Sequence, residues 1–276
     1  MDWSLVLVSQ GIETTIDYAP DGKGWALLVS PNDFDSALNA IRLYRLENRG
    51  WPWQKRVPGP EVLFDWGSLA WVSLVAFFFW LDTNNGFRSI GVMSRTAVTQ
   101  GQWWRLFTAI WLHADLGHLA SNAVFGFILL GLSMGRYGTG AALLAAYLAG
   151  VAGNIATGLV FTDDRAGLGA SGMVMGSLGV VAAQSISLWR ENPRNVKYIV
   201  SGVAGGIMLF ALLGLTPGTN IVAHLGGFVV GLLLGALLTR IPATTRNWKL
   251  NLVLGLIFSL LVVLPWWLAI SRAKFS

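Results

Sequence analysis

The chain contains no cysteine, few charged residues and only three histidines in 276 positions. The absence of cysteine excludes disulfides and thiolate chemistry, although it does not identify the compartment. Charged residues make up 12% of the chain, about half the share typical of a soluble domain. No acidic residue follows Glu191, so the last third of the chain supplies no carboxylate for catalysis or metal binding.

Apolar residues dominate instead and make up 54% of the chain. A membrane-spanning helix needs about 20 mostly apolar residues. Seven segments approach or reach this length: 66–82, 116–135, 140–161, 169–188, 198–214, 219–239 and 250–270. The sequence therefore predicts an all-α, multi-pass membrane protein. In such a chain the net charge of +5 reports orientation in the bilayer rather than affinity for nucleic acid.

The distribution of Lys and Arg predicts that orientation, because cytoplasmic loops carry the excess of positive charge. With a cytoplasmic N-terminus, twelve Lys and Arg residues lie on the inner side and six on the outer side. The basic residues after the seventh span, Arg272 and Lys274, argue mildly in the opposite direction. We therefore expect the N-terminus inside and the C-terminus outside.

The first 60 residues have a different pattern, in which polar and apolar positions alternate. No apolar core follows a basic start, so we expect no secretory signal peptide. Short strands are expected over Leu5 to Val8, Ile12 to Asp17 and Trp25 to Val29, followed by a helix from Pro31 to about Asn48. Residues 1–60 are thus predicted to form a small cytoplasmic α+β domain, with the Pro-rich stretch 51–60 as its linker.

Polar side chains in three of the spans fall at one depth. Ser171 opens the fourth span and His224 lies one to two turns into the sixth, and both spans enter from the outer side. The second span also enters from outside and carries His118 and Asn122, four residues apart on one helix face. A titratable imidazole at membrane depth usually marks function. These four residues are the candidate site.

Glycines on the same spans predict how the helices approach one another. Gly227, Gly231 and Gly235 follow His224 on one helix face, and the span of Ser171 offers a similar face of Gly172, Gly176 and Gly179. Small residues at such spacing allow the backbones of membrane helices to come close. Ordinary helix packing uses the same pattern, so the glycines alone do not indicate a site. The informative feature is that His224 lies on the same helix face as these glycines.

These residues could support acyl transfer. A serine becomes nucleophilic when a base takes its proton, and neutral imidazole is suited to that near pH 7. No acidic residue in a span could complete a triad, so a Ser171–His224 dyad is the expected arrangement. Acyl transfer also needs hydrogen-bond donors for the developing oxyanion. The candidates are the backbone N–H of Ser171 and the side chains of His118 and Asn122.

Over residues 62 to 240 the chain resembles the rhomboid intramembrane serine proteases. Four motifs in order carry the resemblance: Trp104-Arg105, His118-x-x-x-Asn122, Gly169-Ala170-Ser171-Gly172 and Ala223-His224-Leu225-Gly226-Gly227. The resemblance implies a bacterial rhomboid-like bundle, with a six-helix core over residues 61–240 and a seventh transmembrane helix with a tail over 241–276. It also implies a multi-pass protein of the inner (cytoplasmic) membrane.

By the same resemblance, Ser171 is the nucleophile, His224 the general base, and His118 and Asn122 line the oxyanion hole. Arg105 is expected to brace the first outer loop. The implied partners are the lipid bilayer and transmembrane protein substrates, cut near the outer face. No metal or cofactor is implied. One position departs from the family: many members carry an aromatic residue four after the serine, where this chain has Met175.

Several alternatives stay open at this level. The chain could be a rhomboid-like pseudoprotease that binds transmembrane helices without cutting them, or a small transporter with His118 and His224 as a proton relay. The outer loop rich in Trp and Phe could be an interfacial belt or a shaped, substrate-facing element. His113 is expected to be solvated or interfacial, and residues 163–165 to form a solvated turn. No His-Glu-x-x-His motif is present, so a metal site is disfavoured.

Overall fold

The computed structural model describes residues 2–18, 24–48, 63–164, 166–191, 196–214, 219–241 and 247–273. The chain forms two compact units, Met1–Glu61 and Val62–Ser276. The linker expected over residues 51–60 and the charged residue Arg165 lie outside the described residues. Each unit is described by itself below.

The N-terminal unit is a two-stranded sheet with two helices. It comprises α1 (Asp2–Ser9), β1 (Thr14–Tyr18), β2 (Trp25–Val29), a 3-10 turn (Pro31–Asp33) and α2 (Phe34–Glu47). The strands are antiparallel, with Thr14 opposite Val29 and Tyr18 opposite Trp25. The strand expected over Leu5 to Val8 is wrong, because these residues belong to α1. A run of four apolar residues does not distinguish strand from helix, and the side chain of Leu7 is buried with Ile12 and Ala37.

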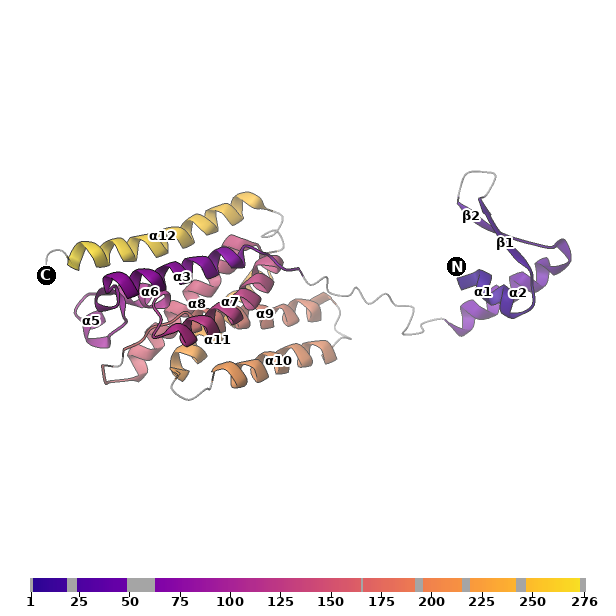
Figure 1. Ribbon diagram of the computed structural model, residues 1–276. Coiled ribbons are helices and arrows are strands. Elements are labelled where there is room, and N and C mark those ends of the chain that lie inside the picture. Colours follow the sequence, from indigo (N-terminus) through magenta and orange to yellow (C-terminus); the bar gives the residue numbers. More distant parts are fainter. Residues whose placement is uncertain are drawn as a thin grey trace. The chain divides into compact units, whose positions relative to one another are not determined.

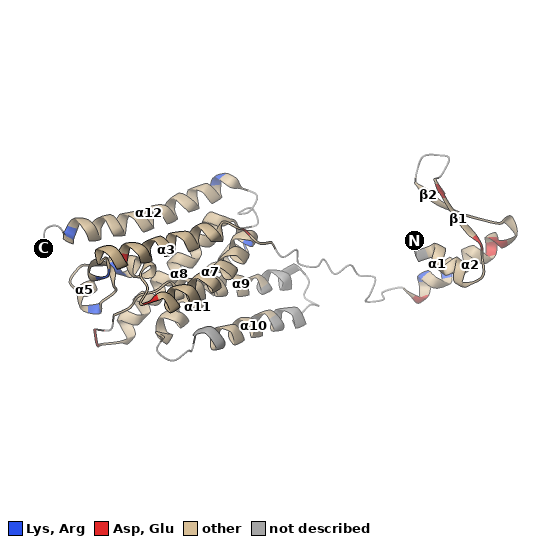
Figure 2. Cartoon of the chain, viewed as in Figure 1, with Lys and Arg blue, Asp and Glu red and all other residues tan. Residues whose placement is uncertain are grey.

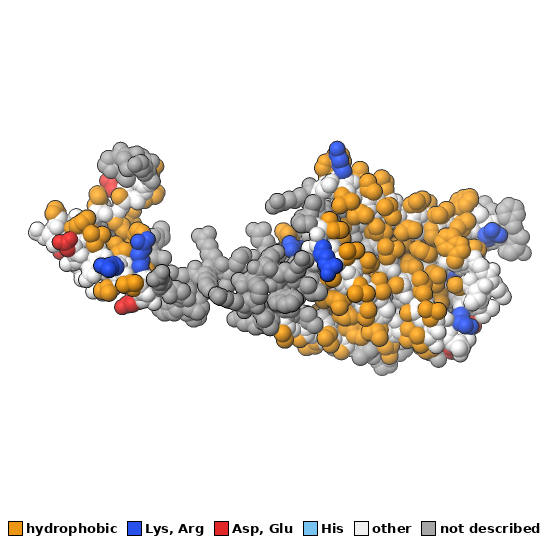
Figure 3. All heavy atoms as spheres, turned by 180° about the vertical axis from the view of Figure 1, so that it is seen from behind, with side chains coloured by type: hydrophobic (Ala, Val, Ile, Leu, Met, Phe, Trp, Pro, Cys, Tyr) orange, Lys and Arg blue, Asp and Glu red, His pale blue; other side chains and the backbone are white. Residues whose placement is uncertain are grey.

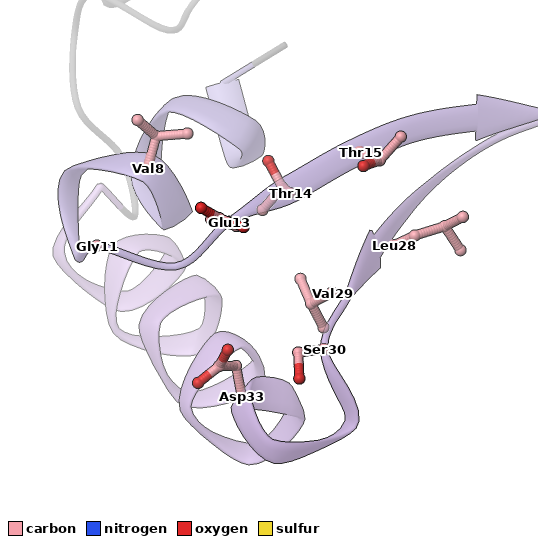
Figure 4. Close-up of a pocket in the computed structure, with 9 residues that line it drawn as sticks. All are labelled: Val8, Gly11, Glu13, Thr14, Thr15, Leu28, Val29, Ser30 and Asp33. Atoms are coloured by element: carbon pink, nitrogen blue, oxygen red, sulfur yellow. The ribbon is translucent and has the colours of Figure 1, made fainter.

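A pocket opens in this unit beside the first strand (Figure 4). Its lining comes from the end of α1, both strands and the 3-10 turn, and consists of Val8, Gly11, Glu13, Thr14, Thr15, Leu28, Val29, Ser30 and Asp33. None of these residues belongs to the predicted site.

The second unit is a helical bundle (Figure 1). Its helices are α3 (Ser68–Asn85), α4 (Arg88–Gly91), α5 (Arg95–Thr99), α6 (Arg105–Thr108), α7 (Leu116–Tyr137), α8 (Thr139–Val160), α9 (Ser171–Glu191), α10 (Val196–Gly214), α11 (Ile221–Leu238) and α12 (Trp248–Ala273). A 3-10 turn, Ala109–Trp111, precedes α7. Among the described residues, α7, α8, α11 and α12 are long and apolar enough to cross a membrane. The number of spans, seven, therefore remains a prediction.

The surface of this unit suits a bilayer. Figure 3 shows hydrophobic side chains covering most of one face between Lys and Arg residues near its two ends. On α11, Leu225, Val229, Leu233 and Leu237 recur every four residues and are each at least 44% exposed. In the cartoon of Figure 2, the described charged residues of the unit lie at helix ends and in loops. Soluble proteins rarely expose so large an apolar surface to water. We therefore conclude that the chain is an integral, multi-pass membrane protein.

Helices α9 and α11 pack with their backbones in contact. A Cβ atom added to Gly227 would collide with the carbonyl oxygen of Gly172, and one added to Gly231 would collide with that of Gly176. One added to Gly179 would meet the backbone of α11 in the same way. Only glycine permits this approach, so the small-residue stripes determine which faces of the two helices meet.

The connection between α3 and α7 contributes two tryptophans to the core of this unit. Trp111 is completely buried and Trp104 is 8% exposed. The indole nitrogen of Trp111 donates to the Tyr147 hydroxyl of α8 at 3.2 Å. The interfacial-belt interpretation is therefore wrong for these two tryptophans, because their rings complete the protein core. Trp103, at 43% exposed, is the outward-facing member of the set.

Helix α12 belongs to the same compact unit. Its Trp266 stacks on Phe78 of α3, with ring centroids 5.1 Å apart. The side-chain oxygen of Asn251 accepts hydrogen bonds from the backbone of Gly140 and Ala141 at 2.6 and 3.1 Å. These two N–H groups at the start of α8 have no partner within their own helix, so α12 supplies the cap.

Candidate active site

The serine of the predicted site is the first residue of α9. The turn before it contains Gly169, whose φ of +120° is one that L side chains rarely adopt. The carbonyl of Ala170 accepts the N–H of Val174, so the helix begins immediately at Ser171. The positive end of the helix dipole therefore lies at the serine, where it favours negative charge.

His118 lies directly against this turn. A Cβ atom added to Gly169 would come within 2.6 Å of His118 Cε1 and 2.7 Å of its Nε2. The ring's Nδ1 accepts the N–H of Ala114 at 3.4 Å. In the neutral imidazole this hydrogen bond leaves the proton on Nε2, so the ring presents a donor beside the turn that precedes Ser171.

Asn122 lies one helical turn further along α7 and is 5% exposed. Its Nδ2 donates to the carbonyl oxygen of His118 at 2.9 Å. An amide nitrogen carries two hydrogens, so the second remains for another acceptor. The side chain of Asp115 caps the start of α7 by accepting the N–H of His118 at 2.8 Å.

His224 occupies the first turns of α11 and is 4% exposed. The start of this helix is held by Asn220, whose Oδ1 accepts the N–H of Ala223 and whose Nδ2 donates to Thr157 of α8, both at 3.0 Å. His224 also lies within electrostatic range of His118. The backbone contact between Gly172 and Gly227 lies one residue after Ser171 and three after His224. The fold thus brings the helix starts of α7, α9 and α11 together.

Arg105 bonds to three groups of the loop between α3 and α7. Its guanidinium donates to Gln102 Oε1 at 2.6 Å, to the Val92 carbonyl at 2.8 Å and to the Ser89 carbonyl at 2.9 Å. Partial burial lowers the pKa of Arg105 from its ordinary value, yet an arginine stays charged at neutral pH. Trp104, beside it, belongs to the main hydrophobic core.

Met175, the position that departs from the family pattern, is 3% exposed and belongs to the same core. It lies one turn beyond Ser171 on α9. A thioether is flexible enough to fill irregular space in a core, so the substitution is accommodated by packing.

The expectation that His113 is solvated is wrong, because the side chain is completely buried. Its Nε2 accepts the N–H of Ala170, the residue before the serine, at 3.4 Å. Its ring meets that of His118 edge-on, with centroids 5.1 Å apart. Burial, and secondarily the neighbouring His118, lower the pKa of His113 to about 4, against an opposing effect of the Trp111 backbone. His113 is therefore neutral at pH 7.

A signal in the sequence could have indicated this position. His113 follows the apolar run Ala109 to Leu112, all of which is buried, and directly precedes the segment that carries His118.

The solvated turn expected over residues 163–165 is, at Asp164, also hydrogen-bonded to the loop between α3 and α7. Asp164 is exposed but accepts hydrogen bonds from Ser94 Oγ at 2.8 Å and the Thr96 N–H at 3.1 Å. These two bonds, the Thr96 N–H first, lower the pKa of Asp164.

No group of three or more His, Asp or Glu residues in the described part of the chain is placed to hold a metal ion. The site consists of hydroxyl, imidazole and amide groups at three helix starts. Such groups suit nucleophilic attack and oxyanion stabilisation.

Fold and site together define a multi-pass membrane protein with a serine and a histidine on adjoining helices. Comparison with known families makes the class specific: the Rhomboid domain matches residues 100–241, which is half of the chain. The chain belongs to the rhomboid family, and the resemblance seen in the sequence is confirmed.

Individual relatives agree with this assignment. The chain is 29% identical to RHOMBOID-like protein 5 of Arabidopsis thaliana over 56% of its length and 50% of the relative's. It is 31% identical to Rhomboid protease GluP of Bacillus subtilis over 59% and 33%, respectively. It is 30% identical to Putative rhomboid protease YdcA of the same species over 57% and 75%. The chain thus spans half or less of the length of the first two.

Proposed function

We propose that the protein is an intramembrane serine endopeptidase that cleaves transmembrane protein substrates near the outer membrane face. The main support is the backbone contact between Gly172 and Gly227, which joins the helix that begins at Ser171 to the helix that carries His224. Two relatives with protease names support the same activity.

In the proposed mechanism, Ser171 Oγ attacks the carbonyl carbon of the scissile peptide bond while His224 takes the hydroxyl proton. The oxyanion receives hydrogen bonds from the Ser171 N–H, His118 Nε2 and the second hydrogen of Asn122. His224 then gives its proton to the leaving amine as the C–N bond breaks. Hydrolysis of the acyl-enzyme, with His224 again acting as base, returns Ser171 to its hydroxyl form.

The test uses purified protein in liposomes with a transmembrane reporter and a fluorophosphonate probe. In the probe reaction, Ser171 Oγ bonds to phosphorus, fluoride leaves, and His224 receives the proton. We expect wild-type protein to cut the reporter and to be labelled at Ser171. Ser171→Ala and His224→Ala should each lose cleavage by at least about 10⁴-fold, because dyad groups act as a unit.

Two outcomes would contradict the proposal. Cleavage that survives Ser171→Ala would rule out the dyad. Reporter binding without cleavage by the wild-type protein would favour the pseudoprotease alternative.

A further inference from the structure

The loop between α3 and α7 is fastened to the segment that leads into Ser171. Met93 and Gly167 form an antiparallel bridge, with reciprocal N–H to carbonyl hydrogen bonds of 3.0 and 2.9 Å. Two residues further on, the N–H of Gly169 donates to the Ala109 carbonyl at 2.9 Å. These attachments use backbone groups only, so they hold the segment without depending on side-chain identity.

The last attachment before the serine depends on a side chain. His113 Nε2 accepts the N–H of Ala170, the residue that immediately precedes Ser171. The His113 ring also packs edge-on against His118. A single buried imidazole therefore touches both the nucleophile turn and a proposed oxyanion donor.

The backbone of His113 is held in turn by an ion pair at the end of α3. Arg88 donates from Nη2 to the carbonyls of His113 and Ala114 at 2.6 and 3.3 Å. The same guanidinium donates to Asp82 Oδ2 from Nε at 3.1 Å and from Nη2 at 3.0 Å. Asp82 Oδ1 accepts the N–H of Arg88 at 2.6 Å. The side chain of Asp82 is 5% exposed and that of Arg88 is 45% exposed.

We propose that Asp82, Arg88 and His113 form a positioning relay that fixes Ser171 and His118 relative to each other. The proposal rests on the proposed function, because the relay acts through those two residues and touches no substrate. Asp82 orients the guanidinium, the guanidinium fixes the His113 backbone, and the His113 ring fixes the Ala170 N–H. Each of these three contacts is a hydrogen bond.

Physical chemistry favours this role over simple filling of space. An arginine that shares its donors between a buried carboxylate and two carbonyls has fixed geometry, which a lysine ammonium cannot reproduce. A displacement of about 1 Å at a catalytic group lowers the rate by about 100-fold. A relay that fixes both the nucleophile turn and the oxyanion donor therefore affects catalysis without touching substrate.

The first pair of variants tests His113. His113→Phe keeps an aromatic ring but has no acceptor, whereas His113→Gln places an amide oxygen near the position of Nε2. We expect the saturating rate of fluorophosphonate labelling at Ser171 to fall about 100-fold in His113→Phe and to stay within about tenfold of wild type in His113→Gln. A space-filling role would leave the phenylalanine variant nearer to wild type.

The second pair tests the ion pair. Arg88→Lys keeps the positive charge beside Asp82 but lacks the planar guanidinium group with its several donors. We expect the rate of labelling at Ser171 to be at least about tenfold lower than in wild type. Arg95→Gln is the matched control, since Arg95 donates to the Gly158 carbonyl at 3.1 Å in the same outer loop and belongs to no part of the relay. Its labelling rate should stay within about twofold of wild type.

Hydrogen exchange of the peptide covering residues 166–174 supplies a readout that does not depend on activity. We expect exchange at the Ala170 amide to rise at least about tenfold in His113→Phe and in Arg88→Lys, with exchange of the α9 amides after it unchanged. Unchanged exchange in both variants would overturn the relay even if labelling slowed. A wild-type protein that is not labelled at Ser171 would overturn the proposed function, while the exchange data would still decide whether the relay exists.

Discussion

At the scale of single residues, Gly169 is the most constrained position of the candidate site. It combines a φ of +120° with the imidazole of His118 at the place a Cβ atom would occupy. Gly169→Ala should therefore move the ring as well as strain the turn, and we expect probe labelling of Ser171 to slow by at least about 100-fold.

Gly101→Ala is the control for that prediction, because Gly101 has a φ of +96° and no atom within 4 Å of an added Cβ. It carries the backbone strain, about 1 to 2 kcal/mol, without the collision. Both variants should lose thermal stability, Gly169→Ala more than Gly101→Ala, and only Gly169→Ala should lose labelling. Equal labelling rates in the two would show that His118 is not positioned by the turn.

The residues of the candidate site could be predicted because each stands at or near a helix start that the sequence indicates. Ser171, His118 and His224 are polar residues near the beginnings of apolar segments. The burial of His113 is indicated only indirectly, by the apolar run that precedes it, because it also depends on the loop between α3 and α7 folding back over the start of α9. Local sequence gives no measure of that long-range contact.

At the scale of helices, the contact between α9 and α11 should tolerate no added volume. Gly231→Ala would push a methyl group into the Gly176 carbonyl, and overpacking of this kind costs about 1 to 3 kcal/mol. We expect a lower melting temperature in detergent. Gly205→Ala on α10, where an added Cβ meets nothing within 4 Å, should melt at or slightly above the wild-type temperature.

A melting temperature for Gly231→Ala equal to that of Gly205→Ala would show that the two backbones can separate at low cost. The glycine stripe itself was visible in the sequence as a repeat of four after Gly227. A similar face of Gly172, Gly176 and Gly179 on the fourth span was visible as well, but the sequence did not show which residues of the two faces meet, because the spans carry several small-residue faces. Pairing of such faces is decided by the whole bundle.

At the scale of the molecule, the predicted orientation places residue 36 inside and residue 100 outside. Because the chain has no cysteine, single substitutions report accessibility without background. Ser36→Cys and Gln100→Cys both replace exposed residues. In intact cells, a membrane-impermeant maleimide should label Gln100→Cys and should reach Ser36→Cys only after lysis. The reverse pattern would mean that the chain inserts in the opposite direction.

The sequence could predict a helical membrane protein because apolar segments and charged loops alternate along it. It could not predict how the loop between α3 and α7 folds, since the rings of Trp104 and Trp111 suit the membrane interface and the protein core equally well. Core packing against Tyr147 decided the outcome for Trp111. The short N-terminal segment over Leu5 to Val8 was ambiguous for the related reason that too few residues show a period.

The position of His224 along α11 has a consequence for the supply of water. It is the fourth residue of a helix that begins at Ile221, so it lies about 5 Å below the helix start. The hydrocarbon core of a bilayer is about 30 Å thick and excludes water, whereas each peptide bond cut by hydrolysis consumes one water molecule. The proposed dyad at the helix starts would therefore lie close to the hydrated headgroup layer, where water is available as the second reactant, whereas a dyad at the bilayer centre would lack it.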